Sequence, residues 1–317
     1  MNIVLLDVKT LGDGLDFSVL EPFGHVTKYD FTTPAELPLR IADADVILIN
    51  KIKITAEVLA AAKRLRLICV FATGYDNVDV AACRAHGVAV CNVRGYSTNA
   101  VAQLTILMAL TLTEKLKAYT DFVKDGGYAQ AGLPNRLSPL YHEICGKTFG
   151  IVGAGAIGRA VGRIAEALGC RVLYHTRTKK DDLPCVSLET LLCEADILSL
   201  HVPLSDSTRG LIGKNELAQM KPGAILINVA RGAVTDEAAV ADAVKAGKLG
   251  GFATDVYSVE PFPKTHPFAD LIDFDNVLLT PHMAWGAYEA RVRCLGEIVK
   301  NIEAFVRGEK RNRVDIQ

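Results

Sequence analysis

Three side chains suited to acid–base catalysis and to binding a carboxylate lie in the last third of the chain, each after a short apolar run. Arg231 follows Ala224–Val229, Glu260 follows Gly251–Asp255, and His282 follows Val277–Thr280. The carboxyl ends of parallel strands form one edge of a sheet, and open α/β sheets bind ligands there. The separations of 29 residues (231 to 260) and 22 residues (260 to 282) suit successive strands of one sheet. We therefore expect the three side chains to meet at that edge.

These residue types suit hydride transfer to an α-keto acid. An arginine fork clamps a planar carboxylate with two parallel hydrogen bonds, so Arg231 would bind the substrate and polarise its carbonyl. Charge builds on the carbonyl oxygen as hydride arrives, so His282 would donate a proton in reduction and accept one in oxidation. Glu260 would orient the imidazole and favour its protonated form. Each residue also has an ordinary alternative: a surface ion pair, a turn cap, or a hydrogen-bonded histidine at a strand end.

A glycine-rich turn between an expected strand and an expected helix indicates a bound dinucleotide. The apolar run Thr148–Val152 leads into Gly153-Ala-Gly155-Ala-Ile-Gly158, and apolar residues then recur at helical spacing as far as Gly169. Gly153 would permit the tight turn, Gly155 the close approach of backbone to a pyrophosphate, and Gly158 the packing of helix on strand. The helix N-terminus would face the phosphates. The alternative is a plain glycine-rich turn.

The choice of cofactor depends on the end of the next strand, where an acid usually grips the ribose 2′-hydroxyl. That position is Thr176, 18 residues after Gly158. Three cations follow it: Arg177, Lys179 and Lys180. With no carboxylate to repel a 2′-phosphate and three cations to attract one, the sequence favours NADP(H), or the use of both NAD(H) and NADP(H). The alternative is a solvated basic loop that Asp181 and Asp182 partly neutralise.

Length and composition set the broad class. A chain of 317 residues predicts two domains, and the net charge of −1 gives no pull toward nucleic acid or an anionic membrane. With neither a secretory leader nor a long apolar run, we expect a cytoplasmic protein. The eight cysteines are scattered without a C-x-x-C pair, so we expect them to be buried small apolar residues. The seven histidines are dispersed, and we expect no metal site.

The rhythm of short apolar strands and helices predicts parallel sheets covered on both faces. In residues 1–97 the expected strands are Ile3–Leu6, His25–Tyr29, Val46–Asn50, Leu67–Phe71 and Val88–Cys91. Ser97 and Thr98 would cap a long helix leading into a second domain, whose later strands complete a six-stranded parallel sheet. A last helix, at about 287–307, would return to the first domain.

The expected fold is therefore α/β with two Rossmann-like domains, each a doubly wound parallel sheet. Residues 98–285 would form the NAD(P)-binding domain, inserted into a discontinuous, flavodoxin-like substrate-binding domain of residues 1–97 and 286–317. An active site would lie in a cleft between the two domains. The Gly/Pro-rich stretch 125–140 predicts a loop, with a dimer contact as the alternative.

Strand ends in the first domain supply candidate substrate contacts. Lys51 follows the run ending at Asn50, and Ala72, Thr73 and Gly74 follow Leu67–Phe71, where a turn would present backbone N–H groups. Ordinary surface turns are the alternative for both. In the second domain, His201 follows an expected strand, and we expect it to be a neighbour of the cofactor rather than a catalyst.

Seven motifs, in order along nearly the whole chain, resemble the D-isomer-specific 2-hydroxyacid dehydrogenase family: FATGYDNVD, NVRGYSTNAVAQ, GKTFGIVGAGAIG, HVPLSDSTRGLI, NVARGAVTDE, DVYSVEP and LLTPHMAW. The resemblance implies two Rossmann-like domains, a homodimer, and catalytic Arg231, Glu260 and His282. It also implies that Asp255 faces the nicotinamide carboxamide. Further cofactor contacts are implied for Ala156, Ile157, the Thr176 position, Val229 and Ala230. Other candidates for cofactor contacts are Arg177, His201, Val202, Pro203 and His282.

Within that family the chain is most similar to the glycerate dehydrogenase/hydroxypyruvate reductase subgroup. The similarity rests on GYST after Asn92-Val93-Arg94, on HPFADLIDFDNVLLTPHMAW, and on Trp285, which the resemblance places beside the substrate cleft. It implies reduction of hydroxypyruvate or glyoxylate to D-glycerate or glycolate. Two alternatives stay open: a dehydrogenase for another 2-keto acid, of the 3-phosphoglycerate or D-lactate type, and a dinucleotide-sensing corepressor that shares the fold.

Overall fold

The computed structural model describes residues 1–316, which form two compact units. Unit 1 comprises Met1–Ser97 and the chain from Trp285 onward, and unit 2 comprises Thr98–Ala284. The predicted boundary falls one residue later, after 285. Trp285 belongs to unit 1, where its ring packs edge-on against Tyr96, with ring centroids 6.5 Å apart. Each unit contains one parallel sheet between helices, as the sequence predicts.

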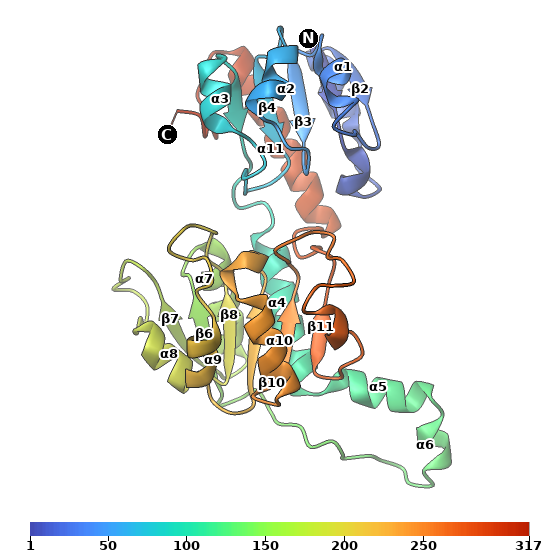
Figure 1. Ribbon diagram of the computed structural model, residues 1–317, viewed down its shortest axis with the longest axis vertical. Helices are drawn as coiled ribbons and strands as arrows, with labels where there is room; N and C mark the ends of the chain where they lie inside the picture. The colour runs from blue at the N-terminus through green and yellow to red at the C-terminus, as the bar shows by residue number, and fades with distance from the viewer. Residues whose placement is uncertain (317) are drawn as a thin grey trace. The chain divides into compact units, whose positions relative to one another are not determined.

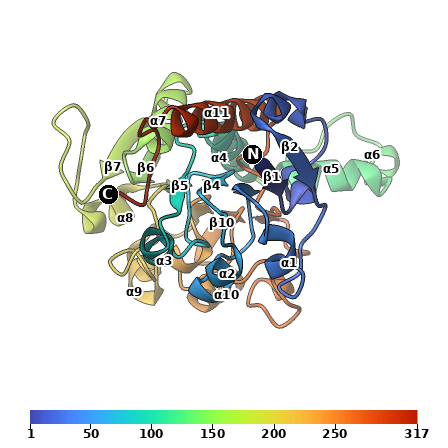
Figure 2. The ribbon, with the colours of Figure 1, turned by 90° about the horizontal axis from the view of Figure 1, so that it is seen from above.

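Unit 1 is built on a five-stranded parallel sheet in the order β2-β1-β3-β4-β5, the flavodoxin-like order. Its strands are β1 (Asn2–Leu5), β2 (His25–Lys28), β3 (Val46–Ile49), β4 (Leu67–Val70) and β5 (Ala89–Cys91). Helices α1 (Leu37–Ile41), α2 (Ala56–Ala61) and α3 (Val80–Ala85) cover one face, and α11 (Tyr288–Val306) covers the other (Figures 1 and 2). Two 3-10 helices, Val8–Leu11 and Phe17–Phe23, follow β1. Strands β3 and β4 are apolar throughout because both of their faces are buried.

Unit 2 is built on a six-stranded parallel sheet in the order β11-β10-β9-β8-β6-β7. Its strands are β6 (Thr148–Val152), β7 (Arg171–His175), β8 (Ile197–Leu200), β9 (Ala224–Asn228), β10 (Leu249–Thr254) and β11 (Val277–Leu279). Helices α4 (Thr98–Thr113) and α7 (Ala156–Ala167) lie on one face, and α8 (Leu188–Glu194), α9 (Lys214–Gln219) and α10 (Glu237–Lys245) on the other (Figures 1 and 2). The chain winds away in both directions from β6, so the carboxyl edge beside β6 is a switch point, where such sheets bind ligands.

An arm formed by residues 115–141 projects from unit 2 and carries α5 (Leu116–Lys124) and α6 (Gly127–Gln130) (Figure 1). The sequence predicts a loop over 125–140, and this prediction is wrong for α6, where the chain makes a short helix. The two sides of the arm are held together near its base. The Tyr119 hydroxyl donates to the carbonyl of Pro139 over 2.6 Å, and its ring packs edge-on against Tyr141.

Most of the thiols are buried, as predicted. Five cysteines are buried (Cys69, Cys83, Cys91, Cys170 and Cys294), and burial raises the pKa of the Cys91 thiol to about 12. The prediction is wrong for Cys145 and Cys193, which are exposed. Cys193 lies on the outer side of α8, because its neighbours Leu191 and Leu192 fill the core.

The described residues contain neither a membrane-spanning helix nor a cluster of metal ligands. In residues 1–316, no helix is long and apolar enough to cross a membrane. Over the same residues, no group of three or more histidines, cysteines and carboxylates could hold a metal ion.

Candidate active site

The glycine turn after β6 contains two glycines that the fold requires and one that it does not. Gly153 has a φ of 101°, and a Cβ there would lie 2.7 Å from the carbonyl oxygen of His201. A Cβ on Gly158 would overlap the carbonyl oxygen of Gly153, so α7 can approach β6 only with glycine there. A Cβ on Gly155 would meet no atom of residues 1–316 within 4 Å, apart from its chain neighbours. The open space at Gly155 fits the predicted role of admitting a pyrophosphate close to the backbone.

The N-terminus of α7 offers hydrogen-bond donors beside this turn. Gly155 is the N-cap residue and supplies no side-chain cap. Ala156 and Ile157 begin the helix; Ala156 is exposed and Ile157 is half-buried. The first N–H groups of a helix have no partner within it and carry the positive end of the dipole. An anionic diphosphate therefore fits here on chemical grounds.

The segment after β8 lines the other side of the turn. Burial lowers the pKa of His201 to about 3, so its ring is neutral near pH 7. Its Nε2 atom lies 2.9 Å from the Ser199 hydroxyl, while Nδ1 is buried and has no hydrogen-bond partner in residues 1–316. Such orphaned atoms are rare, and one at a binding edge suits a ligand. Val202 also faces the turn, since its Cγ1 lies 3.0 Å from a Cβ placed on Gly153, and Pro203 follows it.

The basic loop after β7 keeps more of its positive charge than the sequence suggests. Thr176 donates its hydroxyl to the Thr178 carbonyl over 2.7 Å. Asp182, expected to neutralise the loop, instead pairs with Arg159 of α7 at 2.5 Å, and this contact lowers the pKa of the Asp182 carboxyl. Across residues 1–316, no carboxylate lies within 4 Å of the three loop cations, Arg177, Lys179 and Lys180.

The ends of β9, β10 and β11 lie level with one another. Thr254 pairs in register with both Asn228 and Leu279, and Arg231 and His282 each stand three residues beyond these partners. The Asn228 side chain shapes the first turn, accepting from the N–H of Ala230 and donating to the Arg231 carbonyl, both at 3.0 Å. Arg231 is half-buried, and its Nη1 atom donates to the Ala230 carbonyl over 2.8 Å. The turn carrying Val229 and Ala230 thereby fixes the base of the arginine.

The turns after β9 and β10 pack backbone against backbone. A Cβ on Gly232 would overlap the main chain of Tyr257 and Ser258. Any larger residue at 232 would push apart the turn that carries Arg231 and the loop that carries Glu260. The close approach explains why a glycine follows Arg231 directly.

Glu260 and His282, predicted from separate strands, lie together. The His282 Nδ1 atom is 2.6 Å from Glu260 Oε2, and the Glu260 Oε1 atom accepts from the N–H of Tyr257 over 3.0 Å. Both side chains are partly exposed, His282 to 24% and Glu260 to 30%. The carboxylate therefore fixes the imidazole orientation while both groups stay open to a ligand.

Asp255 holds the loop on both sides of His282, a role that sequence reasoning missed. The carboxylate is 1% exposed, and burial raises its pKa, while three donors oppose that shift. Its oxygens accept from the Thr280 hydroxyl at 2.6 Å and from the N–H groups of Met283 and Ala284, both at 2.8 Å. The sequence contains one signal of this role, because Asp255 is a charged residue at the end of an apolar strand. The donors that bind its carboxylate can be identified only from the fold.

In unit 1, the predicted substrate contacts lie on turns that are fixed by hydrogen bonds to neighbouring segments of the chain. Asp7 accepts from the N–H groups of Asn50 and Lys51, the latter over 2.6 Å. Asp7 follows the first expected strand, Ile3–Leu6, directly in the sequence. The Thr73 hydroxyl donates to the Val93 carbonyl over 2.8 Å.

The rest of that turn is partly accessible. Ala72 and Gly74 are half-buried beside the exposed Thr73. Trp285 is also half-buried in unit 1. The substrate-binding roles of these residues stay predictions.

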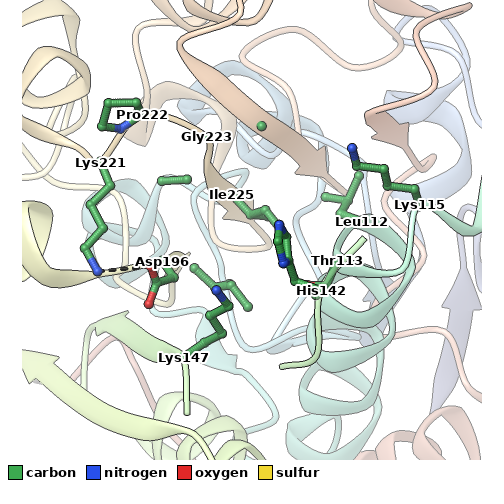
Figure 3. Close-up of a pocket in the computed structure, with 13 residues that line it drawn as sticks. Leu112, Thr113, Lys115, His142, Lys147, Asp196, Lys221, Pro222, Gly223 and Ile225 are labelled. Carbon is green, nitrogen blue, oxygen red and sulfur yellow. Dashed lines mark hydrogen bonds and ion pairs between the residues drawn. The ribbon is translucent and has the colours of Figure 1, made fainter. Parts of the chain in front are cut away.

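A cavity of about 360 Å³ lies at the opposite, amino edge of the unit 2 sheet (Figure 3). Lys115, His142, Lys147 and Lys221 line it together with Asp196. Asp196 already accepts from Lys221 at 3.0 Å and from the N–H of Thr148 at 2.8 Å. None of the candidate active-site residues lines this cavity, so it is a separate feature of the sheet.

The sheet, the glycine turn and the open helix N-terminus define unit 2 as a dinucleotide-binding domain. Residues 106–284 match the family described as D-isomer specific 2-hydroxyacid dehydrogenase, NAD binding domain. The chain is 39% identical to a glycerate dehydrogenase of Methylorubrum extorquens over 99% of both proteins. It is 36% identical to a hydroxypyruvate reductase of Blautia hydrogenotrophica, over 99% of this chain and all of the relative.

A solved acyclic imino acid reductase, in complex with NADPH and D-Arg, superposes with a TM-score of 0.87 at 28% identity, covering 99% of this chain and all of that one. The chain belongs to the D-isomer-specific 2-hydroxyacid dehydrogenase family, as its motifs predict. It is an oxidoreductase of the 2-hydroxyacid dehydrogenase type.

The open space at Gly155 makes a test of cofactor binding. We expect Gly155→Ala to leave the melting temperature unchanged, because the new methyl group meets no protein atom. The same methyl would stand where the pyrophosphate approaches, so affinity for NADH and NADPH should fall at least about tenfold, about 1.4 kcal/mol. Nucleotide fluorescence titration measures this, with Gly296→Ala, also unobstructed, as the control. Unchanged affinity would contradict the assigned binding mode.

Proposed function

We propose that the protein is an NAD(P)-dependent reductase of hydroxypyruvate or glyoxylate. In the reverse direction the same enzyme would oxidise D-glycerate, as a glycerate dehydrogenase. One observation carries the proposal: the Glu260–His282 pair, 2.6 Å apart, stands at the ligand-binding edge of the dinucleotide-binding sheet. The two curated relatives, a glycerate dehydrogenase and a hydroxypyruvate reductase, support this choice of acid.

The proposed roles follow from the side chains. Arg231, on the neighbouring turn, binds the substrate carboxylate through its guanidinium fork and polarises the carbonyl. The His282 ring, held through Nδ1 by Glu260, moves its proton through Nε2 to the carbonyl oxygen. The bound nicotinamide dinucleotide supplies the hydride. Asp255 keeps His282 in place by binding the residues on both sides of it.

The reaction is tested by following NADH and NADPH oxidation with hydroxypyruvate, glyoxylate, pyruvate and bulkier 2-keto acids. We expect hydroxypyruvate or glyoxylate to be turned over most efficiently. His282→Ala should lower kcat by about 10²–10⁴ without weakening NAD(P)H binding, because it removes the proton donor. The matched control is His142→Ala, a histidine at the amino edge of the sheet.

Arg231→Ala extends this test to the carboxylate clamp and should mainly raise KM for every keto acid. If the wild-type protein turns over none of the acids, the proposed enzyme activity is wrong, and a dinucleotide-sensing protein is favoured. Preference for pyruvate would redirect the assignment to a D-lactate type.

The basic loop supports a preference for NADP(H), or use of both cofactors. Arg177 follows Thr176 directly, and Asp182, one of the two carboxylates expected to neutralise the loop, pairs with Arg159. A guanidinium beside a 2′-phosphate contributes a charge-assisted hydrogen bond. The family match names NAD, and one structural neighbour is a complex with NADPH, so the comparisons support either cofactor.

Arg177→Asp tests the preference. The variant replaces attraction for a 2′-phosphate by repulsion, so the ratio of kcat/KM for NADPH to that for NADH should fall about 10- to 100-fold. Steady-state kinetics with both cofactors measures the ratio. Lys310→Asp makes a similar change of charge on an exposed residue in unit 1 and should leave it unchanged. A ratio unaffected by Arg177→Asp would show that the loop is solvated and takes no part.

The arm of residues 115–141 supports a homodimer. It presents exposed apolar side chains, among them Leu133 at 65%, Leu137 at 70% and Leu140 at 69%. Large apolar side chains gathered on one projecting segment mark an association surface. The relatives are enzymes of small acids, so a second copy of this chain is the partner we propose for that surface.

The paired substitution Leu137→Asp and Leu140→Asp tests this partner. Two charges in an apolar interface must be desolvated on association, so light scattering after size exclusion should find monomer where the wild-type protein is dimeric. Leu39→Asp, at a leucine 83% exposed on α1, is the control and should stay dimeric. A wild-type protein that is monomeric at all concentrations would contradict the proposal.

A further inference from the structure

A second glutamate–histidine pair lies buried behind the loop that carries Glu260. Glu237 begins α10 and is 9% exposed, and His266 is 7% exposed. The Glu237 Oε2 atom accepts from His266 Nε2 over 3.0 Å and from the Ser258 hydroxyl, and Oε1 accepts from the Ser258 N–H over 2.8 Å. A single carboxylate therefore binds both ends of the segment 258–266.

The histidine is held in one tautomer. Its Nδ1 atom accepts from the N–H of Phe268 over 3.2 Å, so the ring proton stands on Nε2 and points at Glu237. The ring also packs against Phe262, with centroids 5.0 Å apart, and against Tyr257 at 6.0 Å. Tyr257 in turn donates its N–H to Glu260. The same aromatic cluster thus links His266 to the residue that hydrogen-bonds Glu260.

A role in packing alone does not explain this pair. Within residues 1–316, His266 is the only potential cation within 4 Å of Glu237, and no lysine or arginine stands there. Burying a carboxylate is costly, and apolar residues of similar size often replace such groups without loss of stability. What an apolar residue could not do is accept hydrogen bonds from Ser258 and His266 together.

We propose that Glu237 and His266 are positioning residues for the reaction, which hold the segment 258–266 so that Glu260 meets His282. The inference rests on the proposed function, since it assigns these residues a task through Glu260. Neither residue contacts the reacting atoms. Glu237 sits in the first turn of α10, where the helix dipole favours a negative charge, so the anchor is itself fixed on a rigid element.

The test measures kcat, KM for hydroxypyruvate, NAD(P)H affinity and melting temperature in matched variants. Glu237→Gln turns one carboxylate oxygen into an N–H donor, which then faces the donor N–H of Ser258 or of His266. The variant should lower kcat about 10- to 100-fold, with KM and cofactor affinity changed less than about threefold. His266→Phe keeps the aromatic packing without the bond and should do the same. His266→Gln retains a donor at the Nε2 position, and His266→Asn does not reach Glu237. Only His266→Gln should recover kcat to within about threefold of wild type.

Asp196→Asn is the control, because it alters a hydrogen-bonded carboxylate at the far edge of the same sheet. It should lower the melting temperature and leave kcat unchanged. Wild-type kcat in both Glu237→Gln and His266→Phe would overturn the proposal. So would equal losses in kcat, KM and cofactor affinity that follow the melting temperature, because they indicate packing alone.

Two further arms keep the test decisive. If Glu237→Gln fails to fold, the His266 variants and the milder Ser258→Ala decide the outcome. The proposed function is judged separately, by turnover in the wild-type protein and its loss in His282→Ala.

Discussion

The carboxyl edge of the second sheet depends on one buried carboxylate. Asp255 lies at the end of β10 with 1% of its surface exposed, and three donors from the neighbouring β11 loop surround it. A buried carboxylate without such donors would cost several kcal/mol, so the loop that supplies them is held in one conformation. His282 stands inside that loop. The geometry of the Glu260–His282 pair therefore depends on Asp255, although the Asp255 side chain forms no hydrogen bond with either residue.

Much of this protein can be predicted from sequence, because parallel sheets leave strong local signals. β6 has the predicted bounds, since an apolar run and a glycine turn mark both of its ends. The last helix, predicted at about 287–307, is α11 (Tyr288–Val306). The six-stranded sheet and the family follow from the alternation of elements and the order of motifs. Arg231, Glu260 and His282 could be chosen because each follows a strand end.

What the sequence could not supply are contacts between side chains far apart along the chain. Glu237 and His266 are 29 residues apart. Glu237 ends the motif NVARGAVTDE and His266 begins HPFADLIDFDNVLLTPHMAW, but neither motif indicates that the two side chains pair. The pairing of Arg159 with Asp182 removed a neutralising charge that simple counting had given to the basic loop. The short helix α6 and the exposed Cys193 were missed for the same reason. Whether a residue faces the core depends on its neighbours in space, and these cannot be identified from hydrophobic periodicity alone.

The basic loop after β7 has a consequence for how this enzyme can diverge. Its cations are exposed, outside the sheet and without carboxylate partners in residues 1–316. Substitutions at such surface positions usually change the free energy of unfolding by less than about 0.5 kcal/mol. In the proposed role of this loop as the site that selects the cofactor, cofactor preference is separated from fold stability. On that proposal, a lineage can change between NADP(H) and NAD(H) by mutations that selection for stability does not oppose.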